Sequence, residues 1–396
     1  MWVQGYCCIS SELRSGNRLR GNQYCLQSLI LCMNLNPNNV AQFLAERKLL
    51  SFDSVVDGDF LVMDQNSRNR NLKIIRRKSE GFFIKQIPQQ TPEFMQSMQR
   101  EAACYRLGNE SKKLGEFPSL TPRFYHFDPL RYILIIELLA DSESVWEYHK
   151  RMGSLPVDVG RLLGAKLGAY HATARVNGQT EGFEVFGRQI PWILSIHETN
   201  PMYLNQVSRG NAQLIGIVQQ YPEFQSALAE LKAQWNFSTL IHGDIKWENM
   251  MLRKAAGEPA LELKVIDWEI ADVGDECWDA GAVIQAYLTF WVFSLPLSSG
   301  MSLADAAASS NYSGEALKQA LTAYWTSYAE SRGLNQTASR QKLLRSMRCA
   351  AARMIQTAYE SIQSSPQISP YALCKLQMSM NILRDPRNAV EDLMGL

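Results

Sequence analysis

Residues 241–250, IHGDIKWENM, constrain this chain more than any other segment, because they place a histidine, an aspartate, a lysine and an asparagine in one short turn. Asp244 and Asn249 stand five positions apart. The carboxylate of Asp244 can accept a proton, and the amide oxygen of Asn249 can bind a hard metal ion. Lys246 lies between them and adds a positive charge. This pattern is typical of a turn that holds phosphate and metal. The alternative is a polar turn in which His242 and Asp244 only cap the backbone through hydrogen bonds.

A second carboxylate follows on a strand pattern. Residues 250–253 and 261–268 are largely apolar and flank the turn sequence AAGEP, which predicts a hairpin. The hairpin would return Asp267, eighteen residues after Asn249, to a position beside it. Because Mg²⁺ prefers hard oxygen ligands, the pair predicts a magnesium site next to the turn.

Phosphoryl transfer is the reaction that this set of groups suits. Its transition state is loose and carries its charge on the peripheral oxygens, so it needs positioned metal, nucleophile and cations rather than covalent help. Asp244 is predicted to orient and deprotonate an acceptor hydroxyl, and Asn249 and Asp267 are predicted to bind Mg²⁺. Lys246 is predicted to stabilise the transferring phosphate. His242 is predicted to brace the backbone rather than to carry a proton.

Composition fits a globular enzyme with two lobes. Of the 396 residues, 46% are hydrophobic, which is enough to fill cores on both sides of a cleft. Forty basic and thirty-nine acidic side chains nearly cancel, which gives no reason to expect nucleic acid or a membrane surface as a partner. Eight cysteines show no metal-ligand spacing, so free thiols in a reducing, cytoplasmic compartment are expected. Residues 280–297 approach transmembrane length, but Gln285, Thr289 and Pro296 interrupt them, which favours a buried core helix.

Hydrophobic periodicity divides the chain into three parts. Residues 1–32 lack periodicity and are expected to be flexible or outside the fold. Residues 33–137 predict an N-terminal lobe with an antiparallel five-stranded sheet and one main helix, and residues 138–396 predict a mainly helical C-terminal lobe. The expected strands are 60–64, 72–76, 81–87, 123–127 and 132–136, and the expected helices are 91–109, 145–152, 157–175, 211–235 and 280–396 with breaks near 309–313 and 364–370.

Three segments together resemble a known family. The loop 241–250, VIDWE (265–269) and GDECWDAG (274–281) are similar to the aminoglycoside phosphotransferase and choline kinase family, small-molecule kinases with the protein-kinase-like fold. In that family His-Gly-Asp replaces the His-Arg-Asp of most protein kinases, and Asp-x-Glu replaces Asp-Phe-Gly. Both replacements are present here. The resemblance implies Asp244 as catalytic base, and Asp279 as a buried acceptor that holds the backbone of the catalytic loop.

The resemblance also implies a nucleotide site in the first lobe. Lys85, at the end of FFIKQ, stands where the family keeps its phosphate-binding lysine, and Glu101 follows sixteen residues later as its expected ion-pair partner. Glu93 or Glu110 is the alternative partner, and a surface lysine at a strand edge is the alternative for Lys85. Residues 137–139, from Glu137 to Leu139, would form a hinge whose backbone groups meet the adenine edge of ATP.

One departure from protein kinases is plain. Residues 64–71, DQNSRNRN, contain no glycine where protein kinases have a Gly-rich phosphate loop. Small-molecule kinases of this family often lack that loop. Backbone amides and Ser67 are then expected to meet the phosphates, with Arg68 or Arg70 as helpers.

The resulting expectation is an ATP-dependent phosphotransferase that moves the γ-phosphate of Mg·ATP to a hydroxyl of a small molecule such as an aminoglycoside, an amino alcohol or a sugar. Two alternatives stay open: a kinase of protein or peptide side chains, and a nucleotide-binding pseudokinase scaffold. The first is disfavoured because Asp279 follows Glu269 by only ten positions, too few for an activation segment. The role of Glu269 is left open. Candidates for acceptor binding are Glu143, Glu147, Trp278, Tyr359 and Glu360.

Overall fold

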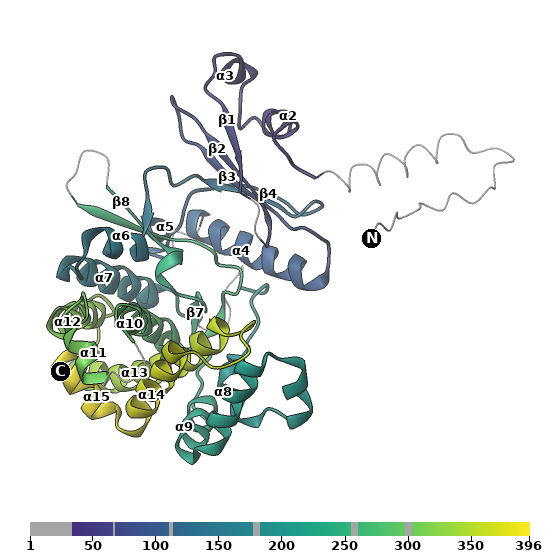
Figure 1. Ribbon diagram of the computed structural model, residues 1–396. Coiled ribbons are helices and arrows are strands. Elements are labelled where there is room, and N and C mark those ends of the chain that lie inside the picture. The colour runs from purple at the N-terminus through teal and green to yellow at the C-terminus, as the bar shows by residue number, and fades with distance from the viewer. Residues whose placement is uncertain (1–33, 66–67, 111–113, 177–182, 255–259, 298–302) are drawn as a thin grey trace, which may run out of the picture.

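The computed structural model describes residues 34–65, 68–110, 114–176, 183–254, 260–297 and 303–396. A smaller lobe built on a β-sheet adjoins a larger helical lobe (Figure 1). The expected α+β architecture with two lobes is therefore confirmed. Residues 1–32, which were expected to lie outside the fold, and Ser67 lie outside the described residues.

The sheet of the smaller lobe has the predicted five antiparallel strands, in the order β1-β2-β3-β5-β4. Its strands are β1 (Leu61–Asp64), β2 (Arg70–Ile75), β3 (Phe82–Gln86), β4 (Phe124–Asp128) and β5 (Ile133–Glu137). The other elements of this lobe are α2 (Val40–Glu46), α3 (Phe52–Val56), α4 (Pro92–Glu110) and α5 (Phe117–Leu120).

Side chains alternate between the two faces of the sheet, because successive residues of a strand point in opposite directions. On β5, Ile133 and Ile135 pack in one cluster with Val40 and Phe43 of α2. Leu134 and Ile136 belong instead to the main core, which includes Met98, Ala102 and Tyr105 of α4. Lys85 pairs with Leu134 across the strands, so it lies on the α4 face. The alternation therefore directs this lysine into the space between the lobes.

The larger lobe is helical apart from short strands near the site. The predicted hairpin is present: Met250 pairs with Val265 and Lys254 with Leu261. The elements are β6 (Glu143–Ser144), α6 (Val145–Met152), α7 (Val157–Thr173), η1 (Trp192–Glu198), η2 (Pro201–Gln206), α8 (Arg209–Gln220), α9 (Pro222–Ala233), β7 (Thr239–Ile241), η3 (Trp247–Asn249), β8 (Met250–Lys254), β9 (Leu261–Val265), β10 (Asp272–Gly274), α10 (Glu276–Phe293), α11 (Leu303–Ala308), α12 (Gly314–Ser331), α13 (Gln336–Ser361), α14 (Pro370–Arg384) and α15 (Pro386–Met394).

The expected helix 211–235 is wrong. Residues 211–235 form parts of two helices, α8 and α9, which meet at Tyr221 and Pro222. Proline has no N–H and its ring clashes with the preceding turn, so it ends α8 and occupies the first turn of α9. The expected breaks near 309–313 and 364–370 are confirmed, because they separate α11 from α12 and α13 from α14. Further breaks, which were not expected, separate α12 from α13 and α14 from α15.

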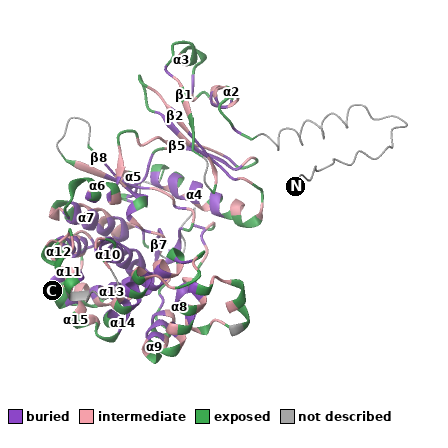
Figure 2. Ribbon diagram, in the orientation of Figure 1, coloured by how far each residue is buried: buried purple, intermediate pink, exposed green. Residues whose placement is uncertain are grey.

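The apolar segment that begins at Ala280 forms a buried core helix, as predicted. Nearly every residue of α10 is buried, and Figure 2 shows it as a mostly purple helix inside the larger lobe. Within the described ranges, no helix combines the length and the apolar composition that crossing a membrane requires. The four cysteines in these ranges, at 104, 277, 349 and 374, are free thiols and buried.

Helices α7 and α12 approach each other closely through a row of glycines. Gly160, Gly164 and Gly168 recur every four residues on α7, and a Cβ atom at Gly164 would lie 2.1 Å from the carbonyl oxygen of Tyr324. No side chain fits in that space. The main chain of α12 therefore rests directly on α7.

We expect Gly164→Ala to destabilise the protein by about 1 to 3 kcal/mol, because the added methyl group must push two backbones apart. The matched control is Gly216→Ala on α8, where an added Cβ meets nothing within 4 Å. That change should stabilise the protein by about 0.5 to 1 kcal/mol, through helix propensity. Urea unfolding of both variants measures the change in the free energy of unfolding. A Gly164→Ala variant more stable than the wild type would contradict the close contact of α7 and α12.

Lys375 of α14 is buried, and no carboxylate among the described residues lies in hydrogen-bond contact with it. It is 1% exposed, its Nζ donates to the carbonyl oxygen of Thr357 at 3.4 Å, and it lies 4.9 Å from the centre of the Phe293 ring. Burial lowers the pKa of this lysine to about 8, although the negative charge of Glu360 opposes the shift. The protonated amine is therefore a cost to the folded state.

This cost predicts a pH-dependent stability. The unfolded chain binds the Lys375 proton up to about its ordinary pKa of 10.5, whereas the folded protein releases it near 8. The free energy of unfolding should therefore rise with pH across this window. We expect Lys375→Met to be more stable than the wild type by roughly 3 kcal/mol below pH 8, with a difference that vanishes near pH 10.5. Unfolding titrations of both proteins measure it, and a pH-independent difference would contradict the assignment.

Candidate active site

Lys85 joins three elements at the centre of the site. Its Nζ donates to Glu101 Oε1 at 2.7 Å and to Asp267 Oδ1 at 2.8 Å. Both side chains are buried. Glu101, the predicted partner on α4, is therefore the one in contact with Lys85. Burial alone would lower the pKa of Lys85, but the two carboxylates outweigh it and raise that pKa. Burial raises the pKa of Glu101 to about 7, with Asp267 adding to the shift and Lys85 opposing it.

Tyr105 adds a link that sequence reasoning missed. It lies one helical turn after Glu101, and its hydroxyl donates to Glu101 Oε1 at 3.4 Å and accepts the N–H of Asp267 at 3.1 Å. Asp267 has a φ of +69°, a conformation that is unfavourable for residues other than glycine. The tyrosine thus supports a strained backbone. The sequence contained a signal for this contact, because Tyr105 follows Glu101 by four positions and residues four apart share a helix face.

Asp279 of α10 holds the backbone of residues 242 and 243 through hydrogen bonds. Asp279 Oδ2 accepts the N–H of His242 at 2.6 Å, and Oδ1 accepts the N–H of Gly243 at 3.0 Å. His242 Nδ1 accepts the N–H of Asp244 at 3.2 Å, and Nε2 lies 2.9 Å from the carbonyl oxygen of Ile266. A neutral imidazole with its proton on Nε2 satisfies both contacts. His242 therefore connects the loop to the segment that leads into Asp267.

Asp244 lies between two cations. Lys246 Nζ is 2.8 Å from Oδ2, and Arg353 Nη2 is 3.3 Å from Oδ1. Burial alone would raise the pKa of Asp244, but Arg353, Lys246 and their neighbours outweigh it and lower the pKa to about 2. The carboxylate is therefore ionised at neutral pH. Arg353 was not anticipated, because it lies 109 residues further along the chain.

Asn249 has its amide group oriented by the same loop. Its Nδ2 donates to the carbonyl oxygen of Asp244 at 3.1 Å, which leaves Oδ1 as its free side-chain ligand atom. The N–H of Ile266 donates to the Asn249 carbonyl oxygen at 2.9 Å, so the hairpin brings Asp267 to the same place. Asn249 and Asp267 line one cavity. Two oxygen ligands fit Mg²⁺, which usually completes its shell with water and phosphate oxygens.

This cavity lies between the lobes and has a volume of about 570 Å³. That volume is within the range of small-molecule sites. It is lined by Lys85 and by the predicted hinge residues Glu137, Leu138 and Leu139. The Glu137 carboxylate is bonded to Arg253 Nη1 at 2.7 Å and to the N–H of Arg123 at 3.0 Å. The Glu137 side chain is therefore committed to these two partners.

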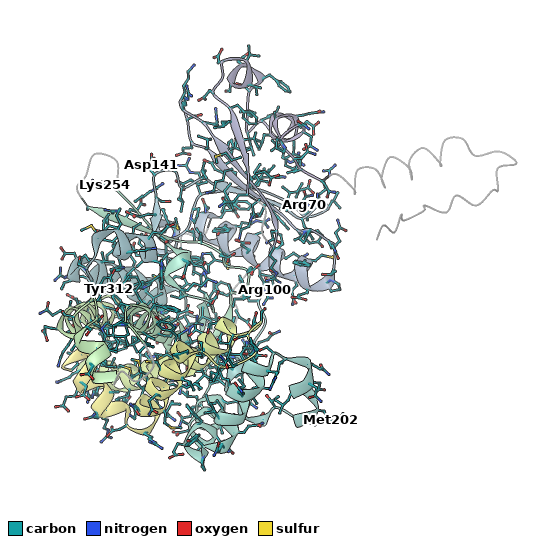
Figure 3. The ribbon with its side chains drawn as sticks, in the orientation of Figure 1. Arg70, Arg100, Asp141, Met202, Lys254 and Tyr312 are labelled. Carbon is teal, nitrogen blue, oxygen red and sulfur yellow. The ribbon has the colours of Figure 1, made fainter. Side chains whose placement is uncertain are left out.

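Arg68 and Glu269 meet across the mouth of the cavity. Arg68 Nη1 donates to Glu269 Oε1 at 3.0 Å and Nη2 to Glu93 Oε1 at 3.2 Å, while the Ser97 hydroxyl donates to Glu269 Oε2 at 3.1 Å. Glu269, for which no role was predicted, thus contacts both the β1–β2 connection and α4. Arg70 is different, because it begins β2 on the smaller lobe (Figure 3) and does not line the cavity as Arg68 does.

The acceptor candidates separate into two groups. Glu143 is paired with Arg151, and Glu147 caps α6 through Ser144, so both are committed elsewhere. Trp278 is buried, and its Nε1 donates to the carbonyl oxygen of Gly243 at 3.0 Å.

Tyr359 and Glu360 remain accessible. Tyr359 packs edge-on against Trp192 of η1, with ring centres 5.1 Å apart. Glu360 accepts from Gln356 at 2.9 Å on the exposed side of α13. Both lie two turns beyond Arg353 on the same helix.

Two solved structures with a similar arrangement of lobes are named as kinases. The chain is similar to a choline kinase of Cryptosporidium parvum, with 11% identity over 90% of this chain and 98% of that one, at a TM-score of 0.54. It is also similar to an ethanolamine kinase of Plasmodium vivax, with 13% identity over 93% and 95% of the two chains, at a TM-score of 0.51. These likenesses define the class: a two-lobed, kinase-like fold.

The family follows from a sequence model. Residues 65–316 match the model of the phosphotransferase enzyme family, and the chain belongs to that family. The resemblance drawn from the 241–250 loop is thereby confirmed, and the protein is a phosphotransferase. No curated protein sequence matches the chain.

Proposed function

We propose that the protein transfers the γ-phosphate of Mg·ATP to a hydroxyl group of a small molecule. The observation that carries this proposal is that Lys85, Asn249 and Asp267 line the interlobe cavity, while the backbone of Asp244 is bonded to Asn249. These groups come from both lobes and supply a phosphate-binding cation, two metal ligands and an ionised base. We keep 33–137 and 138–396 as the two lobes that bind nucleotide and acceptor.

In the proposed reaction the acceptor hydroxyl donates its hydrogen bond to Asp244. As the hydroxyl oxygen forms a bond to the γ-phosphorus, its proton passes to the Asp244 carboxylate and the bond to the β,γ-bridging oxygen breaks, which releases ADP. Mg²⁺, held by Asn249 and Asp267, would neutralise charge on the phosphates. Lys85 would bind the α- and β-phosphates, and Lys246 would face the transferring group.

The acceptor is proposed to enter beside α13. Trp192 and Tyr359 offer aromatic surface, and Glu360 offers a negative charge one residue further. Such a pair suits an acceptor with a positively charged amine, because aromatic faces and carboxylates both attract cations. An amino alcohol or an aminosugar fits this chemistry, and a neutral sugar fits it less well.

The two alternatives are less well supported. A protein kinase needs an extended segment after its metal loop, but only ten positions separate Glu269 from Asp279 and β10 occupies part of them. A pseudokinase scaffold would not need an ionised aspartate beside a metal-ligand pair. The cytoplasm is the proposed compartment, in line with the buried free thiols.

Asp244→Asn tests the base. We expect it to lower kcat by about 100- to 10,000-fold while ATP affinity changes little, because the amide cannot accept the proton. Asp158→Asn, at the first turn of α7, is the control and should be neutral. Transfer from labelled ATP into a panel of amino alcohols and aminosugars measures the rates. Wild-type rates in Asp244→Asn would exclude this base, and ATP binding without transfer by the wild type would favour the scaffold alternative.

Arg68→Met tests how the phosphates are held without glycines. We expect the KM for ATP to rise about 5- to 10-fold, with a smaller change in kcat, because a charged hydrogen bond to phosphate is lost at a half-exposed position. Arg70→Met is the matched control, because Arg70 does not line the cavity, whereas Asn71, the next residue on β2, does. Equal effects of the two substitutions on KM would contradict a specific contact by Arg68.

A further inference from the structure

Arg353, a buried arginine of α13, donates hydrogen bonds to the catalytic loop. Arg353 is 2% exposed, and its guanidinium donates to three successive residues. Nη1 bonds the carbonyl oxygen of Gly243 at 3.0 Å, and Nη2 bonds the carbonyl oxygen of Ile245 at 3.1 Å and Asp244 Oδ1 at 3.3 Å. One planar group thus holds the base carboxylate and the main chain on both sides of it.

This placement is costly for folding. A buried charge loses several kcal/mol of hydration, and a buried ion pair is often no more stable than well-packed apolar residues of the same volume. Arg353 Nε is also buried and has no hydrogen-bond partner among the described residues. The indole ring of Trp278 lies 5.2 Å from the guanidinium carbon and supplies only a cation–π contact. Stability alone gives little reason for an arginine here.

Two other arginines of α13 form ion pairs with residues outside the catalytic loop. Arg345 binds Asp275, and Arg348 binds Glu230 through a bond of 2.7 Å on the protein surface. These pairs tie α13 to neighbouring helices without touching the loop. Arg353 alone among these three reaches residues 243–245.

The reach of Arg353 depends on close packing of α13 against α10. Gly281 of α10 faces α13, and a Cβ atom there would lie 2.4 Å from the carbonyl oxygen of Ser346 and 2.9 Å from the Ala350 nitrogen. The two backbones are therefore in contact one turn before Arg353. This contact brings the guanidinium to the loop on which α10 acts through Asp279.

We propose that Arg353 is a positioning residue for the catalytic base, an inference that rests on the proposed function. It occupies Oδ1 of Asp244 and fixes both flanking peptides, so that Oδ2, shared with Lys246, is the oxygen turned to the acceptor. Because Tyr359 and Glu360 lie on the same helix, α13 sets both the base and the proposed acceptor surface. Movement of α13 would displace the two together.

Three variants separate this role from general stability. Arg353→Met removes the guanidinium, Arg353→Lys keeps a charge without the planar fork, and Arg348→Met removes a surface pair of the same helix. We expect Arg353→Met to lower kcat about 100-fold or more with the KM for ATP within about 2-fold, since small displacements of reacting groups have effects of this size. Arg353→Lys should recover part of the rate, and Arg348→Met should retain it. A wild-type kcat in Arg353→Met, or an equal loss in Arg348→Met, would overturn the proposal.

Hydrogen exchange of the same proteins gives a readout that does not need an acceptor. We expect amides of residues 242–250 to exchange at least about 10-fold faster in Arg353→Met, with exchange in α7 and α12 unchanged. Exchange at the wild-type rate would overturn the anchoring of the loop. If the wild type transfers phosphate to no acceptor, the proposed function fails, and positioning of a base fails with it. Faster loop exchange in Arg353→Met would then show that the anchor is structural.

Discussion

Lys85 donates to two carboxylates that come from different parts of the chain, and the geometry of the site depends on this contact. The lysine belongs to the central strand of the sheet, Glu101 to α4 and Asp267 to the end of the β8–β9 hairpin. A single ammonium group therefore connects the smaller lobe to the proposed metal-binding segment of the larger lobe. Tyr105 strengthens the connection, since it contacts both Glu101 and the backbone of Asp267.

The proposed catalytic loop, residues 241–250, is held on the other side by two helices of the larger lobe. Asp279 of α10 accepts two loop N–H groups, whereas Arg353 of α13 donates to two loop carbonyl groups and to Asp244. The donors and acceptors of the turn are thus satisfied by side chains of opposite charge. Such buried polar networks are expensive to bury and lose much when one member is missing. The arrangement favours a fixed orientation of the proposed base, Asp244, over maximal stability.

Local patterns in the sequence predicted much of the architecture. Alternating apolar residues predicted the five strands, and Asp244, Asn249 and Asp267 were identified through spacing within one loop and one hairpin. The predictions of the sheet and the hairpin are confirmed, because a turn or a hairpin brings near neighbours together by short-range geometry. The expected helix 211–235 is wrong for a local reason as well, since Pro222 ends α8 and begins a second helix.

The sequence by itself determined the family, the sheet and the chemical groups of the loop. Only the tertiary structure decided which distant side chains orient those groups. Tyr105 and Asp267 are 162 positions apart, and Arg353 and Asp244 are 109 apart. Contacts of this kind depend on how helices cross and how closely they pack, as at Gly281, and no periodicity in the chain encodes them. For the same reason Glu269 gained contacts, with Arg68 and Ser97, only in the folded protein.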